Sequence, residues 1–212
     1  MRSIANRLFA FDRLMSSNLN GGLMAGIDEA GRGPLAGPVV AAAVIFIRRG
    51  RFSALNDSKQ VPPAFRESLF REISMHALVG IGVVDEASID RINIYQASRL
   101  AMKKAVLSLT RTPDMLMIDG KARIDLPLSQ KTVVGGDAKS ACIAAASIIA
   151  KVHRDAWMKH LDTVYPGYEF KKHKGYGTPA HLKLLLEKGP SPVHRRSFSP
   201  CSPVSEFEES LS

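Results

Sequence analysis

Residues 24–38 read MAGIDEAGRGPLAGP, and this stretch decides how the rest of the chain is interpreted. An apolar run over residues 23–27 ends abruptly at two adjacent carboxylates, Asp28 and Glu29. Neighbouring strand residues point to opposite faces of a sheet. We therefore expect a strand that ends between or at the two acids, so that both can serve one site.

A turn rich in glycine follows the two acids at once. Gly31 and Gly33 have no Cβ, so backbone N–H groups can approach a ligand oxygen or a sugar, and Arg32 places a fixed cation beside them. An ordinary surface turn is the alternative, since acids and glycines prefer loops. A dinucleotide-binding fingerprint is excluded, because the spacing to Gly37 is one residue too long and residues 39–47 predict a strand where that motif requires a helix.

Size and charge point to a globular protein with an anionic partner. The 212 residues suffice for one well-buried core, and 45% of them are hydrophobic. The net charge is +9, although residues 197–212 contain three glutamates and no lysine or arginine, so the rest of the chain is more basic still. Such a charge favours nucleic acid as the partner, although basic enzymes with small substrates also exist.

Cysteine usage and hydropathy indicate the compartment. Cys142 and Cys201 are the two cysteines, too few for a disulfide framework, which favours a reducing environment. The sequence shows neither a secretory signal nor an uninterrupted apolar run of ~20 residues. We expect a cytoplasmic monomer that makes no contact with a membrane.

Apolar periodicity predicts alternating strands and helices, and hence a mixed α/β sheet in which acids recur just past strand ends. For residues 1–20, a short docked helix and a frayed extension are equally compatible with the sequence. The expected strands cover residues 23–27, 39–47, 78–84, 115–118 and 131–134, and the expected helices cover residues 64–76, 94–109, 140–161 and 179–188.

Composition divides the chain into four parts. Residues 171–196 contain seven lysines or arginines against one acid, Glu187, and include a glycine-bearing loop, which favours phosphate binding. Serine and proline after position 197 favour a flexible tail. The predicted parts are an N-terminal extension (1–20), a catalytic core (21–164), a C-terminal helical substrate-binding segment (165–196) and a flexible acidic tail (197–212).

Four acids stand at strand ends or just before a helix, where ligands bind in open α/β sheets. All offer hard oxygen ligands and no histidine pair accompanies them, which favours Mg²⁺ or Mn²⁺ over zinc. A metal-dependent phosphodiesterase fits this pattern. A non-catalytic nucleic-acid-binding protein and a DNA nuclease that needs no ribose remain alternatives. The four acids are Asp28, Glu29, Asp119 and Asp137.

Several separate motifs, in this order, resemble those of bacterial type 2 ribonuclease H, the ribonuclease HII family. The resemblance covers residues 23–198. It implies a ribonuclease H-like mixed sheet flanked by helices, with a C-terminal helical basic segment. The motifs are residues 28–38, LNDSK at 55–59, IDG at 118–120, GGD at 135–137, IAAASIIAKV at 143–152 with Arg154 and Asp155, and HKGYGT at 173–178.

The resemblance also implies an activity. The family cleaves the RNA strand of RNA–DNA hybrids and incises at single ribonucleotides embedded in duplex DNA. Two divalent ions, Mn²⁺ or Mg²⁺, would assist hydrolysis that leaves 5′-phosphate and 3′-hydroxyl ends.

Site residues follow from the resemblance position by position. The catalytic and metal-binding acids fall on Asp28, Glu29, Asp119 and Asp137. The nucleotide that carries the 2′-OH would contact Gly31, Arg32 and Gly33, and Tyr176 would stack at the RNA–DNA junction. Ser58 and Lys59 resemble a phosphate-contacting loop, although a solvated loop lysine is the alternative.

Some polar residues have simpler explanations. Asp155 follows Asp137 by about five helical turns and would either support the metal acids or form an ion pair on its own helix. We expect His153, His160, His173 and His181 to be surface or packing residues rather than metal ligands.

Overall fold

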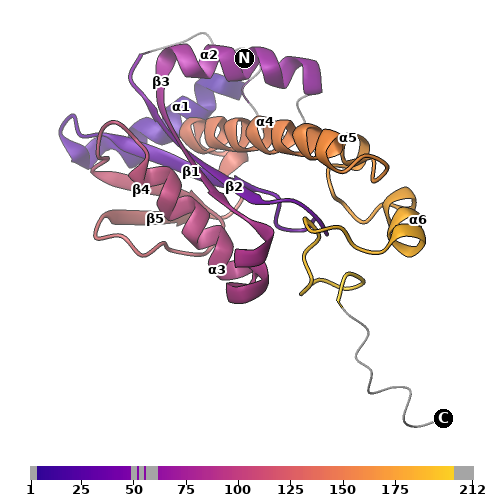
Figure 1. The fold of residues 1–212 in the computed structure, drawn as a ribbon. Coiled ribbons are helices and arrows are strands. Elements are labelled where there is room, and N and C mark those ends of the chain that lie inside the picture. Colours follow the sequence, from indigo (N-terminus) through magenta and orange to yellow (C-terminus); the bar gives the residue numbers. More distant parts are fainter. Residues whose placement is uncertain (1–3, 49–51, 53–54, 56–61, 203–212) are drawn as a thin grey trace.

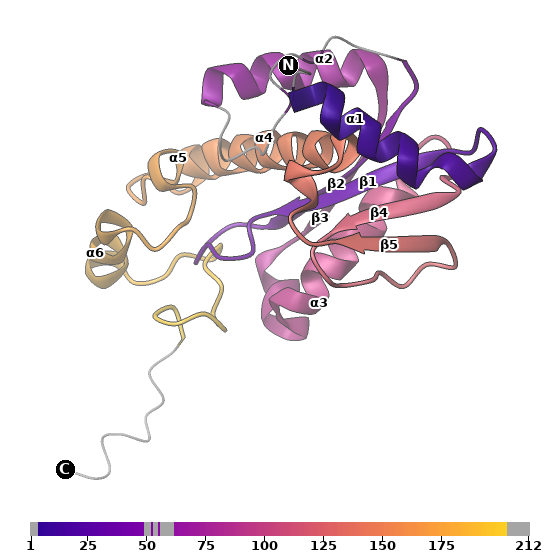
Figure 2. The same ribbon diagram turned by 180° about the vertical axis from the view of Figure 1, so that it is seen from behind.

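A computed structural model describes residues 4–48, 52, 55 and 62–202. Its centre is a five-stranded mixed sheet in the order β3-β2-β1-β4-β5, with helices on both faces (Figures 1 and 2). The predicted fold class is therefore confirmed. The strands are β1 (Met24–Ala30), β2 (Val39–Phe46), β3 (Ala77–Val84), β4 (Met115–Asp119) and β5 (Ser129–Val133), and the longer helices are α1 (Ile4–Met15), α2 (Pro63–His76), α3 (Glu86–Leu107), α4 (Ala141–Val164) and α6 (Pro179–Lys188).

The two central strands are buried because helices cover both of their faces. In β2, Ala42 and Val44 pack towards α1, α2 and α4, whereas Ala41 and Ala43 pack towards α3. Small residues let the helices approach closely. A Cβ at Gly26 of β1 would lie 2.1 Å from the backbone carbon of Cys142 in α4, so only glycine fits there.

Strand β1 is longer than predicted. It pairs antiparallel with β2 through Asp28↔Ala42, Glu29↔Ala41 and Ala30↔Val40. The expectation that the strand ends at or between the two acids is wrong, because β2 keeps this segment extended as far as Ala30. Both acids therefore project from a strand that is held on each side.

Strand β1 also pairs parallel with β4, and β4 pairs parallel with β5. The carboxyl ends of these three strands consequently meet at one edge of the sheet. The 3-10 helix η2 (Gly136–Ala138) follows β5 at that edge and leads into α4. This edge holds the acids that the sequence singled out.

Helix α3 bends at Asn93, which has a positive φ of 63°. Its side-chain Oδ1 accepts the N–H of Gln96, so Asn93 caps the second part of the helix. The predicted helix from residue 94 corresponds to this second part. The first part begins after the N-cap Asp85, whose side chain accepts the N–H of Ser88.

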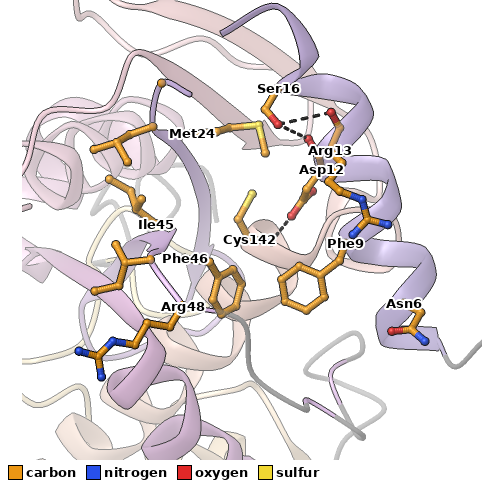
Figure 3. A pocket seen from close by; sticks show the side chains of 13 residues that line it. Asn6, Phe9, Asp12, Arg13, Ser16, Met24, Ile45, Phe46, Arg48 and Cys142 are labelled. Atoms are coloured by element: carbon orange, nitrogen blue, oxygen red, sulfur yellow. Dashed lines mark hydrogen bonds between the residues drawn. The ribbon is translucent and has the colours of Figure 1, made fainter. Parts of the chain in front are cut away.

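The N-terminal segment docks as a helix. Ala5 and Leu8 of α1 are buried, and Asp12 Oδ2 accepts the N–H of Cys142 at 2.9 Å, in the first turn of α4 (Figure 3). Burial raises the pKa of Asp12. Beside α1 lies a cavity of about 440 Å³, bordered by Phe9 and Phe46. The docked alternative is therefore correct for residues 4–15.

After α4 the chain leaves the sheet and covers its end with α5 (Phe170–His173) and α6 (Figures 1 and 2). Residues 193–195 then return to the loop between β1 and β2, where Ala36 and His194 form an isolated β-bridge. No helix in the described ranges is long and apolar enough to span a membrane.

The start of the predicted tail is packed against the body. Ser197 donates from its N–H and its hydroxyl to Asp90 Oδ1, and Phe198 lies with its ring centroid 5.1 Å from the guanidinium carbon of Arg195. Cys201 is 1% exposed. The prediction that flexibility begins at position 197 is wrong for residues 197–201, because Phe198 and Cys201 supply apolar surface to the core.

Candidate active site

Three of the four predicted acids meet at the carboxyl ends of β1 and β4. The parallel register pairs Ile27 with Ile118, which places Asp28 and Asp119 side by side on neighbouring strands. Burial raises the pKa of Asp28 well above its usual range, and the charges of Glu29 and Asp119 add to the effect. Burial likewise raises the pKa of Glu29. The site therefore gathers like charges that a cation would stabilise.

Hydrogen-bond donors of the protein contact each of these three carboxylates. Asp28 Oδ1 accepts the N–H of Glu29 at 2.7 Å, and Asp119 Oδ1 accepts the N–H of Gly136 at 2.7 Å. Glu29 Oε1 lies 3.3 Å from Nη1 of Arg32. Glu29, Arg32 and Asp119 also border a small cavity of about 80 Å³ beneath α3.

The fourth predicted acid, Asp137, lies on η2 and is half-buried. Its neighbour Gly136 makes the hydrogen bond to Asp119, which places η2 beside the end of β4. In the described part of the chain, no group of three or more His, Cys, Asp or Glu side chains is close enough to hold a metal ion. The structure thus brings Asp28, Glu29 and Asp119 together, without convergence on a common point.

The donor set nevertheless fits a hard divalent cation. Its side chains are carboxylates, and burial together with the charges of Glu29 and Asp119 raises the pKa of Asp28. Glu29 is held by Arg32, so a change in the Glu29–Arg32 contact would let its carboxylate turn towards Asp28 and Asp119. Asp28, Glu29, Asp119 and Asp137 are the residues that would hold Mg²⁺ or Mn²⁺.

The predicted nucleotide-binding turn lies beside this edge. Gly31 has a φ of 99°, and a Cβ there would lie 2.1 Å from Nε of Arg154, so glycine is required. Gly33 is exposed and has no such constraint, and the nearest atom to a Cβ there would be Tyr176 Cε1 at 4.0 Å. The structure therefore brings together Gly33 and Tyr176, two residues far apart in the sequence.

Tyr176 belongs to the basic loop before α6. Its ring is 44% exposed, and its backbone carbonyl bonds to Nδ1 of His181. His181 stacks on His173 with ring centroids 4.0 Å apart, and its Nε2 lies 3.0 Å from Nε2 of His194. The packing role predicted for His173 and His181 is confirmed, and His194 is an additional member of this cluster.

Sequence reasoning missed two buried arginines that shape the turn. Arg154 of α4 is 1% exposed and donates to the carbonyls of Ala36, Pro38 and Lys174. The apolar helix around Arg154 could have revealed it in the sequence, because an arginine buried in such a helix needs several hydrogen-bond acceptors.

The second is Arg195, which is 0% exposed. It donates to the carbonyls of Gly31, Arg32 and Gly37. From the sequence, Arg195 is assigned only to the basic segment over residues 171–196.

The remaining predicted residues take simpler places. Asp155 pairs with Lys151 at 2.5 Å and Arg66 at 3.3 Å, so the ion-pair alternative is correct. Ser58 and Lys59 lie outside the described residues.

A family model and individual known proteins match this chain over most of its length. A family model for ribonuclease HII matches residues 25–201. The ribonuclease HII of Endomicrobium trichonymphae is 51% identical over 203 residues, covering 94% of this chain and 95% of that protein. The ribonuclease HII of Geobacillus kaustophilus strain HTA426 is 53% identical over 189 residues, covering 89% and 72%.

A solved structure shares the fold over most of its length. The ribonuclease H2 from Pyrococcus horikoshii OT3 superimposes with a TM-score of 0.71 at 25% identity, covering 84% of this chain and 95% of that one. The chain belongs to the ribonuclease HII family of nucleases, which cleave the RNA of RNA–DNA hybrids.

Proposed function

We propose that this protein is a metal-dependent endoribonuclease that cuts the RNA strand of hybrids and also incises at a single ribonucleotide in duplex DNA. The observation that carries the proposal is the position of Gly33 opposite Tyr176, beside the acids of β1 and β4. A sugar held at Gly33 would have the acids on one side and an exposed aromatic ring on the other.

The four acids would hold the divalent ions. Bound there, Mg²⁺ or Mn²⁺ would activate a water and stabilise the leaving 3′ oxygen, so that the products carry 5′-phosphate and 3′-hydroxyl ends. Asp28 and Glu29 are held by pairing with β2, and Asp119 Oδ1 accepts the N–H of Gly136. This rigidity supports the role of the protein as a positioning scaffold.

Recognition of the ribose would depend on Gly31, Arg32 and Gly33. Within the described ranges, no hydrogen bond uses the N–H groups of Arg32 and Gly33, and both residues are exposed. Such groups suit the 2′-OH, the only difference between the two sugars. The Tyr176 ring would stack on the next sugar only when that sugar lacks a 2′-OH, which favours an RNA-to-DNA step.

The basic segment over residues 165–196 would bind the duplex backbone. Lys171 and Lys172 are exposed there, and the segment lies beyond the same end of the sheet as the acids (Figure 1). Ser58 and Lys59 would add phosphate contacts. A reducing, cytoplasmic location would fit the two free, buried thiols of Cys142 and Cys201.

One assay tests the proposal against its rivals. Three duplexes are compared with and without Mg²⁺ or Mn²⁺: one with a single ribonucleotide, one with a continuous RNA strand, and one of DNA alone. We expect metal-dependent cleavage of the first two. Cleavage of the all-DNA duplex would support a general nuclease, and binding without any cleavage would support a non-catalytic nucleic-acid-binding protein.

A further inference from the structure

The buried guanidinium of Arg154 joins the two loops that the proposed function assigns to recognition. Its Nε lies 3.0 Å from the carbonyl oxygen of Pro38 and its Nη2 lies 3.1 Å from that of Ala36, both in the turn after β1. Its Nη1 lies 3.0 Å from the carbonyl oxygen of Lys174, two residues before Tyr176. One planar group therefore spans both loops.

Arg154 also contacts the functional residues of each loop. Its guanidinium carbon lies 5.9 Å from the centroid of the Tyr176 ring, within the range of a cation–π interaction. Its Nε occupies the space that a Cβ of Gly31 would need. The position of the ring and the path of the turn thus depend on the same side chain.

The loops meet directly at one further point. The N–H of Leu35 donates to the carbonyl of Gly175 at 2.8 Å, and a Cβ at Gly175 would lie 2.4 Å from the carbonyl oxygen of Ala36. The two loops are thus in contact at Leu35 and Gly175. Arg154 adds the contacts that reach Lys174 and the Tyr176 ring, so its movement would change the position of the ring relative to the turn.

Arg195 fixes the same turn from the other side. It holds the carbonyls of Gly31 and Arg32. In the described ranges, no hydrogen bond uses the N–H groups of Arg32 and Gly33. Neither buried guanidinium lies within 4.0 Å of a carboxylate of the described chain. Both arginines therefore donate to backbone carbonyls. The planar, forked guanidinium of arginine can reach several carbonyls at once, and the single ammonium of lysine cannot.

We propose that Arg154 is a positioning residue for junction recognition, which fixes the Tyr176 ring relative to the Gly31–Gly33 turn by bridging the carbonyls of Ala36, Pro38 and Lys174. This inference rests on the proposed function for the meaning of the two loops. Arg154 acts through Tyr176 and touches no substrate.

The test uses Arg154→Lys, which keeps the charge and removes the fork. The first readout is the ratio of kcat/KM on a single-ribonucleotide duplex to kcat/KM on a continuous hybrid. We expect this ratio to fall at least about tenfold, the change expected when a hydrogen bond to a charged group is lost. Tyr176→Ala should lower the ratio similarly, and adding Arg154→Lys to it should lower the ratio no further.

A matched control separates positioning from stability. Ile73→Ala creates a cavity in α2 and contacts neither loop, so it should lower the melting temperature and leave the ratio unchanged. If Arg154→Lys lowers stability while the ratio stays at the wild-type value, or if its effect on the ratio adds to that of Tyr176→Ala, the inference is overturned.

A second readout needs neither metal nor nucleic acid. Amide hydrogen exchange over residues 174–177 should accelerate in Arg154→Lys and stay at the wild-type rate in Ile73→Ala. If the wild type fails to incise the single-ribonucleotide duplex, the proposed function fails, and the exchange data still decide whether Arg154 couples the loops. Unchanged exchange in Arg154→Lys contradicts the coupling.

Gly175→Ala is the second variant if Arg154→Lys does not fold. Its Cβ would push on the carbonyl of Ala36, the acceptor of Arg154 Nη2, and so would disturb the same bridge from the other loop. It should lower the same ratio and accelerate the same exchange. A wild-type ratio in a folded Gly175→Ala protein overturns the inference.

Discussion

Gly33 faces the ring of Tyr176, with so little between them that a Cβ on Gly33 would lie 4.0 Å from Tyr176 Cε1. The first residue follows β1 and the second precedes α6, and the two buried arginines hold both segments in place. The bare backbone at Gly33 and the ring of Tyr176 together form an exposed surface that would suit contact with neighbouring sugars of a nucleic acid backbone.

Gly33→Ala tests the surface formed by Gly33 and Tyr176 without disturbing the fold. The added methyl group would make ordinary contact with Tyr176, and Gly33 does not need a positive φ, so we expect a melting temperature close to wild type. Cleavage of both the single-ribonucleotide duplex and the continuous hybrid should fall, because the methyl group blocks the approach of the ribose. The measurement is a pair of cleavage rates alongside a thermal melt.

Gly31→Ala is the contrasting variant. Its Cβ would collide with Arg154 at a φ of 99°, so stability should fall as well as activity. Wild-type cleavage by a folded Gly33→Ala protein would show that the sugar does not approach this turn.

Asp119→Asn tests the acid cluster. Asparagine keeps an oxygen that can accept the N–H of Gly136, so the fold should persist, while the lost charge weakens metal binding. We expect cleavage to fall by several orders of magnitude and calorimetric Mn²⁺ binding to weaken. Near wild-type turnover in the folded variant would remove Asp119 from the site.

The histidine cluster predicts loss of stability in acid. Burial, assisted by the charge of His181, lowers the pKa of His194 to about 4, and burial lowers the pKa of His173 and His181. The unfolded chain binds these protons first as the pH falls, since the ordinary histidine pKa is about 6.5. Stability should therefore decrease as the pH falls from about 6.5 to about 4.

Thermal melts across that range provide the measurement. In His194→Asn, the amide oxygen can replace Nδ1 as the acceptor of the Ser191 N–H, and one titrating group is gone. The decrease should be shallower in this variant. The same pH dependence in wild type and variant would place its source outside His194.

Two truncations test the packing of the C-terminal segment. Residues 203–212 are acidic and contain three serines, a composition that does not favour packing, so removing them should leave the melting temperature and the cleavage rate close to wild type. Removing residues 197–212 also takes away the Asp90 hydrogen bonds and the burial of Phe198 and Cys201. We expect a drop of roughly 5–15 °C, from a loss of about 2–4 kcal/mol. Equal melting temperatures would show that residues 197–201 contribute nothing to stability.

Much of the fold could be predicted from the sequence, because helices cover both faces of the sheet and its central strands are therefore continuously apolar. Continuous apolar runs predicted β2 and β4 closely, and Asp119, expected just after the strand over residues 115–118, lies at the end of β4. The end of β1 could not be predicted, because antiparallel pairing with β2 holds the acids extended against their own preference for a turn.

The site was predicted less completely, because its shape depends on contacts between distant segments. Local sequence showed that Gly31 and Gly33 leave the backbone accessible, but it did not show that Arg154 and Arg195 hold the surrounding carbonyls. The family resemblance assigned Gly33 and Tyr176 separate contacts with the substrate, and only the folded chain shows that the two residues lie next to each other. Such long-range relations require the folded chain.

The most direct test of the account is a side-by-side cleavage by wild type and Tyr176→Ala of two duplexes, one with a single ribonucleotide and one with a continuous RNA strand. If the exposed ring stacks on the sugar after the ribose, as proposed, the variant should lose far more activity on the single-ribonucleotide duplex than on the hybrid, with hybrid binding retained. Equal loss on both substrates would contradict the account and place junction recognition away from Tyr176.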